Sequence, residues 1–447
     1  MAVLIALVAL PASAQPDPHE TLRARLAAHG VTPLPALPPP DPALYRLGEA
    51  LFYDPILSGN LDTACATCHH PLLGTTDGLS LGLGTGNQGL GPARVHIPGR
   101  PFVARNAPAL FNRGQADWRV MFWDGRVIAR TDGTYLTPAG DALPEGLGGL
   151  LAAQALFPLT AAAEMRGFPG DVAVDGSENT LALLNTPALE PDYPAIWHAL
   201  LDRLLAIDGY REHFRAAYPG APLETLGIQH VVNALEAYQA SAFAYHNAPF
   251  DRYLAGDDAA LSPSALRGAL LFFGEAGCAR CHTGPLLSDQ QFHNVAVPQI
   301  GPGMDDEAPL DYGRGRETGR AADRFAFRTP PLRQVALTGP YMHNGAYTTL
   351  EGAVRHMIAP VAALHDYDPA QLIPELTAQV WNDPPTVAAL LDTLDPLAGA
   401  SRPLTPDEFA DLLAFLHALT DPAAADLGHL IPATVPSGLP VDSPPDS

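Results

Sequence analysis

The sequence predicts a mostly α-helical protein made of two similar lobes with long loops. Several segments carry apolar residues at the spacing of an amphipathic helix, and none alternates convincingly enough for a central sheet. A helix, a turn and a Cys-x-x-Cys-His sequence follow one another twice, which suggests an internal duplication. The 447 residues include 47 prolines and 40 glycines, which favours short helices and extended loops over a long coiled coil.

The first four expected helices surround the two cysteine motifs. Residues 42–57 have helical periodicity and end in a turn before the first motif, and residues 261–273 repeat this arrangement before the second. Two longer periodic stretches, 194–218 and 223–245, lie between the motifs. We expect each stretch to form a single helix.

The last expected helix has the clearest boundary signals. Residues 404–419 begin with Thr405, a good capping residue, followed by proline and then acidic residues. The glycine-rich segments 74–101 and 301–319 are predicted to be loops. Residues 431–447 are rich in proline, and we expect a disordered tail there.

The charge balance narrows the classes of partner. The chain has 25 basic and 48 acidic side chains, a formal net charge of −23. A nucleic-acid-binding protein needs a basic face to follow the phosphates, so this composition argues against nucleic acid. An acidic surface instead suits a basic protein partner, including a small electron carrier.

The first residues indicate export. The segment MAVLIALVALPASAQ is apolar, is too short to span a bilayer and ends near Ala12-Ser13-Ala14, a pattern of small residues at which signal peptides are cleaved. We expect residues 1–14 to be a signal peptide and the mature protein to be periplasmic, a buried helix or a membrane anchor being the alternatives. No later segment has about 20 uncharged apolar residues, so no membrane span is predicted.

All four cysteines fall in two C-x-x-C-H motifs. The residues are Cys65, Cys68 and His69 in the first motif and Cys278, Cys281 and His282 in the second. In a c-type cytochrome the two thiols of this motif bond to the haem vinyl groups and the imidazole binds the iron. A redox-active cysteine pair would need a βαβ context, which the sequence lacks. We therefore expect two covalently bound haem c groups.

Further short motifs occur in a fixed order around the haem sites. They are L-F-Y-D-P at 51–55, R-N-A-P at 105–108, F-W-D-G-R at 122–126, A-E-M at 163–165, F-R-T-P-P-L-R at 327–333 and L-T-G-P-Y-M-H at 337–343. In this order the sequence resembles the bacterial di-haem cytochrome c peroxidases, including the MauG-like enzymes, over residues 42 to 420. The resemblance implies two cytochrome c-like domains: a peroxidatic one over 20–245 and an electron-transfer one over 246–425, whose end packs back on the first.

The resemblance implies a peroxide site above the first haem. Glu164 matches the carboxylate that moves a proton between the peroxide oxygens, Gln154 matches a glutamine that orients peroxide or water, and Pro158 lines the pocket. A surface glutamate and an ordinary polar helix residue are the alternatives for Glu164 and Gln154. The family often has a blocking histidine after the first motif, but residues 79–86 contain none, and His96 lies in an insertion. This favours a first haem that is open on its distal face.

The second haem is expected to transfer electrons, with His282 and a second protein ligand on opposite sides of the iron. Met357 follows T-L-E-G-A-V-R-H and matches the family's ligand position, where MauG-like enzymes have tyrosine. A thioether ligand raises the reduction potential, which suits an electron reservoir. The alternative for Met357 is a core methionine. The other candidate ligands are His356, Met304, Met342 and His343.

Two features are implied between the lobes. Trp123 matches an aromatic residue that lies between the haems and would shorten the electron path, whereas a plain core tryptophan is the alternative. Asn106, Thr329 and Pro331 match a calcium site, and their oxygen atoms suit this hard cation. Simple turn structure is the alternative for these three residues. We expect one calcium ion.

Three functions are consistent with these features. The favoured one is a peroxidase that reduces hydrogen peroxide with electrons from a small cytochrome c or cupredoxin, which Glu164 and Met357 support. The second is a MauG-like enzyme that uses peroxide to oxidise residues of a partner protein, which the missing histidine and Trp123 leave open. The third is a non-enzymatic di-haem electron carrier, which would need neither Glu164 nor Gln154. A homodimer is left open.

Overall fold

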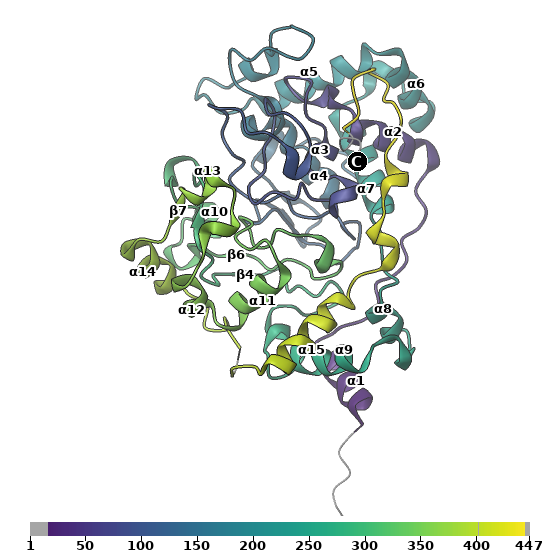
Figure 1. Cartoon of the computed structure of the whole chain (residues 1–447). Helices are drawn as coiled ribbons and strands as arrows, with labels where there is room; N and C mark the ends of the chain where they lie inside the picture. The colour runs from purple at the N-terminus through teal and green to yellow at the C-terminus, as the bar shows by residue number, and fades with distance from the viewer. Residues whose placement is uncertain (1–16, 401, 443–447) are drawn as a thin grey trace, which may run out of the picture.

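The computed structural model describes residues 17–400 and 402–442, so the expected signal peptide lies outside the described residues. The protein is mostly α-helical with long loops, as predicted (Figure 1). Its helices are α1 (Pro18–Ala28), α2 (Pro42–Tyr53), α3 (Cys65–Cys68), α4 (Leu150–Ala155), α5 (Tyr193–Leu205), α6 (Asp208–Ala217), α7 (Ile228–Ala242), α8 (Pro249–Leu254), α9 (Pro263–Phe272), α10 (Arg314–Thr318), α11 (Leu350–Ile358), α12 (Pro360–His365), α13 (Pro374–Thr377), α14 (Pro384–Asp392) and α15 (Pro406–His417).

The strands are short and lie apart from one another in small antiparallel sheets. They are β1 (Val120–Met121), β2 (Val127–Ala129), β3 (Tyr135–Leu136), β4 (Phe292–His293), β5 (Gln299–Ile300), β6 (Phe327–Arg328) and β7 (Val380–Trp381). The order β1-β2-β3 forms one sheet, with Val120 opposite Ile128, and the pairs β4-β6 and β5-β7 form two more. As the sequence predicted, the described residues contain no central sheet.

The first lobe is built on α2, which packs against α7, with α4, α5 and α6 around them (Figure 1). The apolar face of α2 buries Leu47, Leu51 and Phe52 completely, and each such side chain stabilises the fold by about 1.5–3 kcal/mol. A Cβ at Gly48 would collide with the backbone of Ala234 in α7, so this glycine sets the close helix contact.

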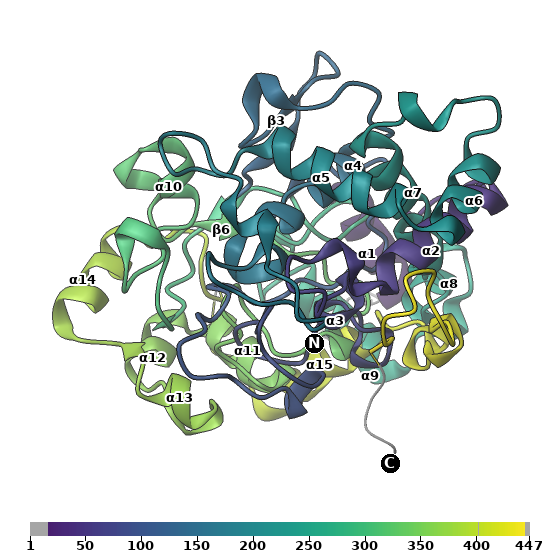
Figure 2. The ribbon, with the colours of Figure 1, turned by 90° about the horizontal axis from the view of Figure 1, so that it is seen from above.

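The second lobe is built on the crossing of α9 and α15. The expected capping of α15 is confirmed, because Thr405 accepts a hydrogen bond from the backbone of Glu408 and the Glu408 carboxylate accepts one from the backbone of Thr405. Gly268 in α9 makes the close contact, since a Cβ there would collide with the backbone of Asp411. Seen from above, α12, α13 and α14 lie on the opposite side of the molecule from α2, α6 and α8 (Figure 2).

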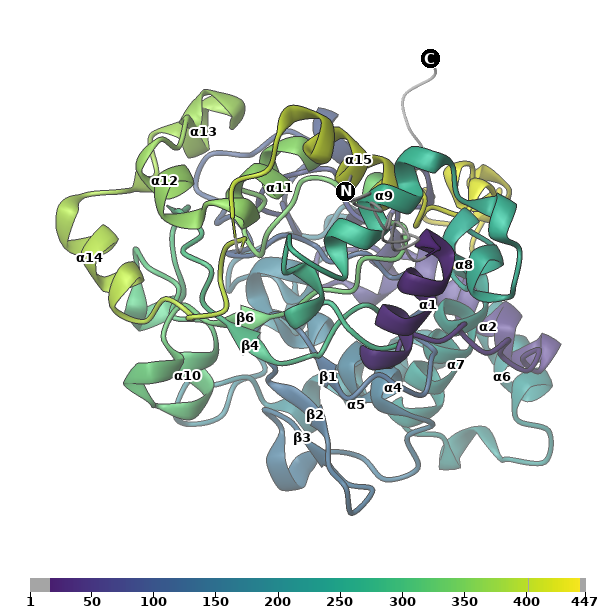
Figure 3. The same ribbon diagram turned by 90° about the horizontal axis from the view of Figure 1, so that it is seen from below.

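The first domain was expected to begin at residue 20, but the N-terminal helix α1 packs with the second lobe. Leu22 and Leu26 of α1 are buried in the core of the second lobe, and α1 lies beside α9 (Figure 3). Residues 18–31 therefore pack with the second lobe, because the apolar face of α1 is buried in its core. The expected single helix over 194–218 is also wrong. It divides into α5 and α6 at the extended residue Ile207, and Arg211 donates to the carbonyl of Leu205 at the end of α5.

The C-terminal segment corrects the expected disordered tail. Residues 431–442 are described, whereas 443–447 lie outside the described residues. Val435 is buried in the core of the first lobe, and Ser437 donates its hydroxyl to Asp54 at the end of α2 (2.6 Å). Thr67 in α3 hydrogen-bonds to the Asp442 carboxylate. Apolar and polar contacts with residues of the first lobe thus hold this segment in place, although its proline content predicted disorder.

Within 17–400 and 402–442, no helix combines the length and the apolar character that crossing a bilayer requires.

Candidate active site

A cavity of about 170 Å³ lies in the first lobe beside the first cysteine motif. Its walls come from α3, α4, the segment around residue 105 and the turn that carries Glu164. The cavity is lined by every residue that the sequence assigned to this site: Cys65, Cys68, His69, Trp123, Gln154, Pro158 and Glu164. The structure therefore brings together residues that are about 100 positions apart in the chain.

The first motif is folded so that its imidazole can bind a metal. Cys65 and Cys68 begin and end the single turn α3, and His69 follows it. The Nδ1 atom of His69 lies 3.2 Å from the carbonyl oxygen of Thr75, which suits a donated hydrogen bond and leaves Nε2 for the metal. Burial lowers the pKa of His69 to about 4, so the ring stays in the neutral form that binds metals.

A second cavity of about 250 Å³ surrounds the second motif. Cys278, Cys281 and His282 line it, and the Nδ1 atom of His282 lies 3.0 Å from the carbonyl oxygen of Leu287. Burial lowers the pKa of His282, as it does for His69. Met357, on α11, lines the same cavity.

The two cavities suit two covalent haems. All four cysteine thiols are free, so none is used in a disulfide. Arg113 is buried, lines both cavities and has no carboxylate partner among the described residues; its guanidinium donates to Ala109 and approaches the sulfur of Met121. A buried cation is costly without an anion, and haem carries carboxylates that could provide one. The donor set therefore fits the group that the cysteine spacing predicts.

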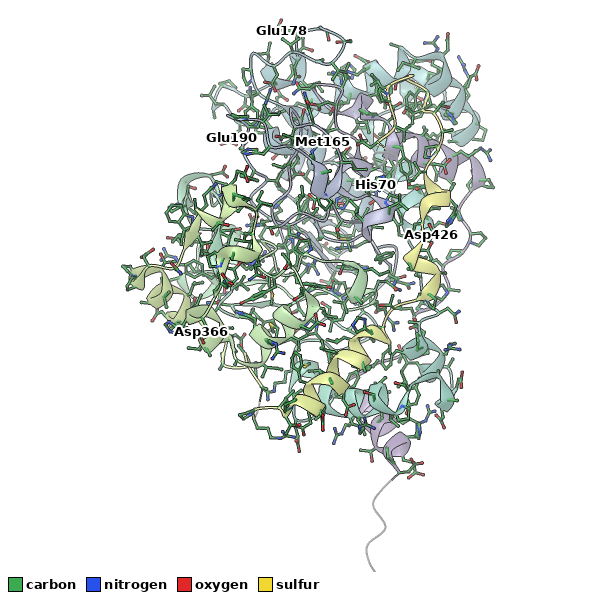
Figure 4. All side chains as sticks on the ribbon, viewed as in Figure 1. His70, Met165, Glu178, Glu190, Asp366 and Asp426 are labelled. Carbon is green, nitrogen blue, oxygen red and sulfur yellow. The ribbon has the colours of Figure 1, made fainter. Side chains whose placement is uncertain are left out.

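Glu164 lies on a π-helical turn, Ala162–Arg166. The backbone amide of Arg166 donates to the carbonyl of Ala161, five residues earlier, which marks this unusual turn. Met165, the next residue, lies inside the first lobe, at the top of Figure 4, whereas Glu178 and Glu190 lie toward the outer edge of this lobe. Burial raises the pKa of Glu164, so its carboxyl holds a proton more readily than one in water.

Charged side chains next to Glu164 partly oppose that shift. Arg126 and Arg105 favour its ionised form, and Asp124 disfavours it. Asp124 pairs with both guanidinium groups, at 3.0 Å for Arg126. Although burial disfavours its charge, these two cations hold the pKa of Asp124 well below its usual range. Arg105 also makes a two-pronged ion pair with Asp311, at 2.7 and 2.9 Å, which joins the charges to the second half of the chain.

Trp123 belongs to the wall that separates the two cavities. It lines both of them, together with Asn106 and Arg113. The indole is 9% exposed, and its Nε1–H donates to the carbonyl of Asn106 at 3.0 Å. The side chain is thus fixed between the two sites.

Comparison with known proteins shows the family to which the chain belongs. A family model for di-haem cytochrome c peroxidase matches residues 42–259. The methylamine utilization protein MauG of Methylorubrum extorquens is 33% identical over 340 residues, which cover 75% of this chain and 74% of that protein. The chain belongs to the di-haem cytochrome c peroxidase family. It is therefore an oxidoreductase, and its two cysteine motifs imply two c-type haems.

Members of different groups within the family show similar identity. Cytochrome c551 peroxidase of Pseudomonas aeruginosa is 31% identical over 315 residues, which cover 70% of each chain. A solved structure of a MauG-like protein associated with microbial copper homeostasis superposes with a TM-score of 0.57 at 27% identity, covering 88% of this chain and 96% of that one. These comparisons agree on the fold and on the family. They do not single out one group within the family, because relatives from different groups have similar identity to this chain.

Two candidate histidines outside the motifs, His356 and His96, form hydrogen bonds to other residues and do not line the first cavity. Both ring nitrogens of His356 are in contact, with the Tyr347 hydroxyl (2.8 Å) and the Val295 carbonyl (2.7 Å), so this runner-up ligand is occupied. The Nε2 atom of His96 lies 2.7 Å from the carbonyl of Arg100, away from the cavity wall. Of the histidines in the described residues, His69 alone lines the first cavity.

The three residues of the expected calcium site, Asn106, Thr329 and Pro331, line the second cavity together. The carbonyl of Thr329 already accepts hydrogen bonds from the Ser288 hydroxyl (2.6 Å) and the Arg328 guanidinium (3.1 Å). A calcium ion bound to this oxygen would lie near a buried positive charge.

Two residues of the first cavity were missed or assigned elsewhere by sequence reasoning. Asp77 is buried and lines the cavity, and its Oδ2 atom has no hydrogen-bond partner among the described residues. Burial raises the pKa of Asp77 to about 7. Met304, considered above for the second haem, lines the first cavity. The acid eight residues after His69 was a signal for Asp77, whereas nothing local pointed Met304 toward this cavity.

Proposed function

We propose that the protein reduces hydrogen peroxide to water in the periplasm, with electrons from a small redox protein. The reaction consumes two electrons and two protons for each peroxide and yields two waters. The observation that carries the proposal is the first cavity, where Glu164, Gln154 and Pro158 lie together beside the haem attachment motif. A protein that only carried electrons would have no need of a buried carboxylic acid there.

The role of Glu164 is proton transfer. Its carboxylate accepts a proton from one oxygen of peroxide and returns it to the other, which becomes water. Burial holds the pKa of Glu164 above its usual value, which makes the carboxylate a better proton acceptor than one in water. The Gln154 amide orients the peroxide by hydrogen bonding, and Pro158 helps to exclude water.

When bound, the haems would relay the electrons of the donor and provide the site at which peroxide binds. His69 would hold the iron of the first haem, and His282 and Met357 would hold the iron of the second. Support for Met357 comes from its position in the second cavity and from the occupied ring nitrogens of His356. Trp123, in the wall shared by both cavities, shortens the path between the two haems.

A calcium ion bound by Asn106, Thr329 and Pro331 is part of the same proposal. Because Thr329 already accepts two hydrogen bonds, the ion would have to displace Arg328 or share the oxygen with it. Equilibrium dialysis of purified protein against calcium after chelation tests this site. One tightly bound ion per chain is expected. Absence of bound calcium would contradict the calcium site.

The function is tested by peroxide turnover. Oxidation of a reduced small c-type cytochrome or cupredoxin is followed after peroxide is added to the protein with both haems. We expect two donor molecules to be oxidised for each peroxide. Peroxide consumption without donor oxidation would contradict the proposal. Light scattering of the same protein reports whether it forms a homodimer.

A second candidate is oxidation of residues in a partner protein. The 33% identity to MauG and the absence of a second histidine from the first cavity favour it. The position of Met357 in the second cavity, where MauG-like enzymes have tyrosine, counts against it. Mass spectrometry of periplasmic proteins after incubation with the protein and peroxide separates the two: covalent changes confined to one partner would favour the second candidate.

A further inference from the structure

The methionines of this protein are distributed in an unusual way. The chain has six, of which Met1 lies outside the described residues. The other five all line one of the two cavities: Met121, Met165 and Met304 the first, Met342 and Met357 the second. Methionine commonly fills gaps in hydrophobic cores, and Met121 and Met165 belong to the core of the first lobe as well as to the cavity wall.

Met304 differs from the other two methionines of the first cavity. Met121 is 2% exposed and receives the Arg113 guanidinium at its sulfur (3.8 Å), and Met165 is 4% exposed. Met304 is partly buried and belongs to the loop 301–310, which follows β5. Its thioether therefore has more room to accept an additional atom.

The loop that carries Met304 lies on the Glu164 side of the cavity. Gly301 packs against Leu81. In the same segment as Leu81, the backbone amide of Thr85 donates to the carbonyl of Glu164 (2.8 Å). At the other end of the loop, Asp311 pairs with Arg105, whose charge acts on Glu164. Both ends of the loop are thus tied to the surroundings of the peroxide site.

We propose that Met304 is an oxidation site, at which peroxide that outruns the electron supply transfers an oxygen atom to the thioether. The proposal rests on the proposed peroxide reduction. The O–O bond breaks, an S–O bond forms and the sulfur loses two electrons. The other peroxide oxygen leaves as water with both protons, so atoms and electrons balance without a further reactant. The product is methionine sulfoxide, which dedicated reductases can restore.

The sulfoxide changes the loop as well as the residue. Oxidation turns a flexible apolar side chain into a polar one, which fits poorly in a largely apolar cavity. Two backbone hydrogen bonds hold Met304, from its amide to Leu310 (3.0 Å) and from the amide of Glu307 to its carbonyl (2.9 Å). Arg316 adds an ion pair to Asp305 at 2.6 Å. When the side chain leaves the cavity, we expect these bonds within the loop to open, which raises hydrogen exchange over 301–310.

The sequence makes the oxidation easy to locate. A protease that cuts before aspartate releases peptides 289–304, 117–123 and 141–170, each with one of the three methionines and none with a haem cysteine. The protein with both haems is treated with peroxide, with or without an excess of a reduced small c-type cytochrome. We expect peptide 289–304 to gain one oxygen several-fold faster than the other two peptides, and reduced cytochrome to suppress the gain.

Three controls make the result decisive. Cyanide bound at the first haem would occupy the cavity that Met304 lines and keep peroxide from the thioether, so it should protect peptide 289–304. Met304→Leu should remove the oxygen gain in this peptide and the peroxide-induced rise in hydrogen exchange over 301–310, whereas the matched Met165→Leu should keep both. Equal oxidation of the three methionines, or oxidation of 289–304 indifferent to cyanide and cytochrome, would overturn the inference. Failure to oxidise cytochrome while 289–304 still gains oxygen would reject the proposed function alone.

Discussion

Replacement of Glu164 by glutamine tests the proton chemistry most directly. Glutamine keeps the size and hydrogen bonding of the side chain but cannot accept the peroxide proton. Glu164 is the predicted carboxyl of the first cavity, and Gln154 beside it cannot replace its function. General acid–base catalysis contributes about 10²–10⁴-fold, so we expect turnover to fall by at least about 10²-fold, or about 2.7 kcal/mol of activation free energy.

The pH dependence gives the same prediction a second readout. Because burial raises the pKa of Glu164, the ionised form that accepts the proton is lost as pH falls through this raised value. Wild-type turnover should fall over that range, while the residual rate of Glu164→Gln should not follow it. Stability should change in the opposite sense. As pH rises from the pKa of Glu164 in the unfolded chain to its raised pKa in the folded protein, the free energy of unfolding of the wild type should fall relative to that of Glu164→Gln.

The assay follows oxidation of a reduced small cytochrome at saturating donor and peroxide. Haem content and cyanide affinity of the variant are measured alongside and should match the wild type. Wild-type turnover in Glu164→Gln would refute the assignment. Asp77, the buried acid with an unpartnered oxygen in the same cavity, would then be the next group to replace.

The remaining predictions concern the haems and the electron path. Cys68→Ala should leave the first haem poorly attached, and a haem-to-protein ratio of one in the intact wild type would contradict the two-haem architecture. The oxidised protein should bind cyanide without prior reduction, because His69 is the one histidine of the described residues in the first cavity; a wholly low-spin spectrum indifferent to cyanide would show that another group closes the site. Met357→Leu should lower the potential of the second haem in a redox titration, since a thioether ligand raises it, and an unchanged potential would exclude Met357 as the ligand. Trp123→Phe should slow electron transfer between the haems in stopped-flow traces, and an unaltered rate would make it a core residue.

Local signals predicted the parts of the structure that depend on neighbours in the sequence. The helix α15 begins at the expected cap, because Thr405 and Glu408 satisfy each other's backbone within one turn. The two cysteine motifs needed no tertiary information either. Residues 194–218, by contrast, keep a helical pattern across Ile207, and the break there is held partly by Arg211. Periodicity alone carries no signal for such a contact.

Contacts between distant segments decided what the sequence could not indicate. The apolar face of α1 has no mark that assigns it to the second lobe, and Val435 alone does not say which core will bury it. The same holds for Met304, whose place in the first cavity depends on the path of a loop more than 200 residues after the first motif. The resemblance to a family supplied Glu164 and Gln154 because their motifs keep a fixed order along the chain.

The C-terminal segment has a consequence for the order of assembly. Asp442 hydrogen-bonds to Thr67, between the two cysteines of the first motif, and Ser437 closes on α2. Asp442 lies 375 positions after Thr67 in the chain, so the surface of the first lobe is complete only after residues 437–442 have been synthesised. Haem attachment at Cys65 and Cys68 can therefore take place while the motif is still uncovered. Residues 437–442 then cover the motif by binding to Asp54 and Thr67.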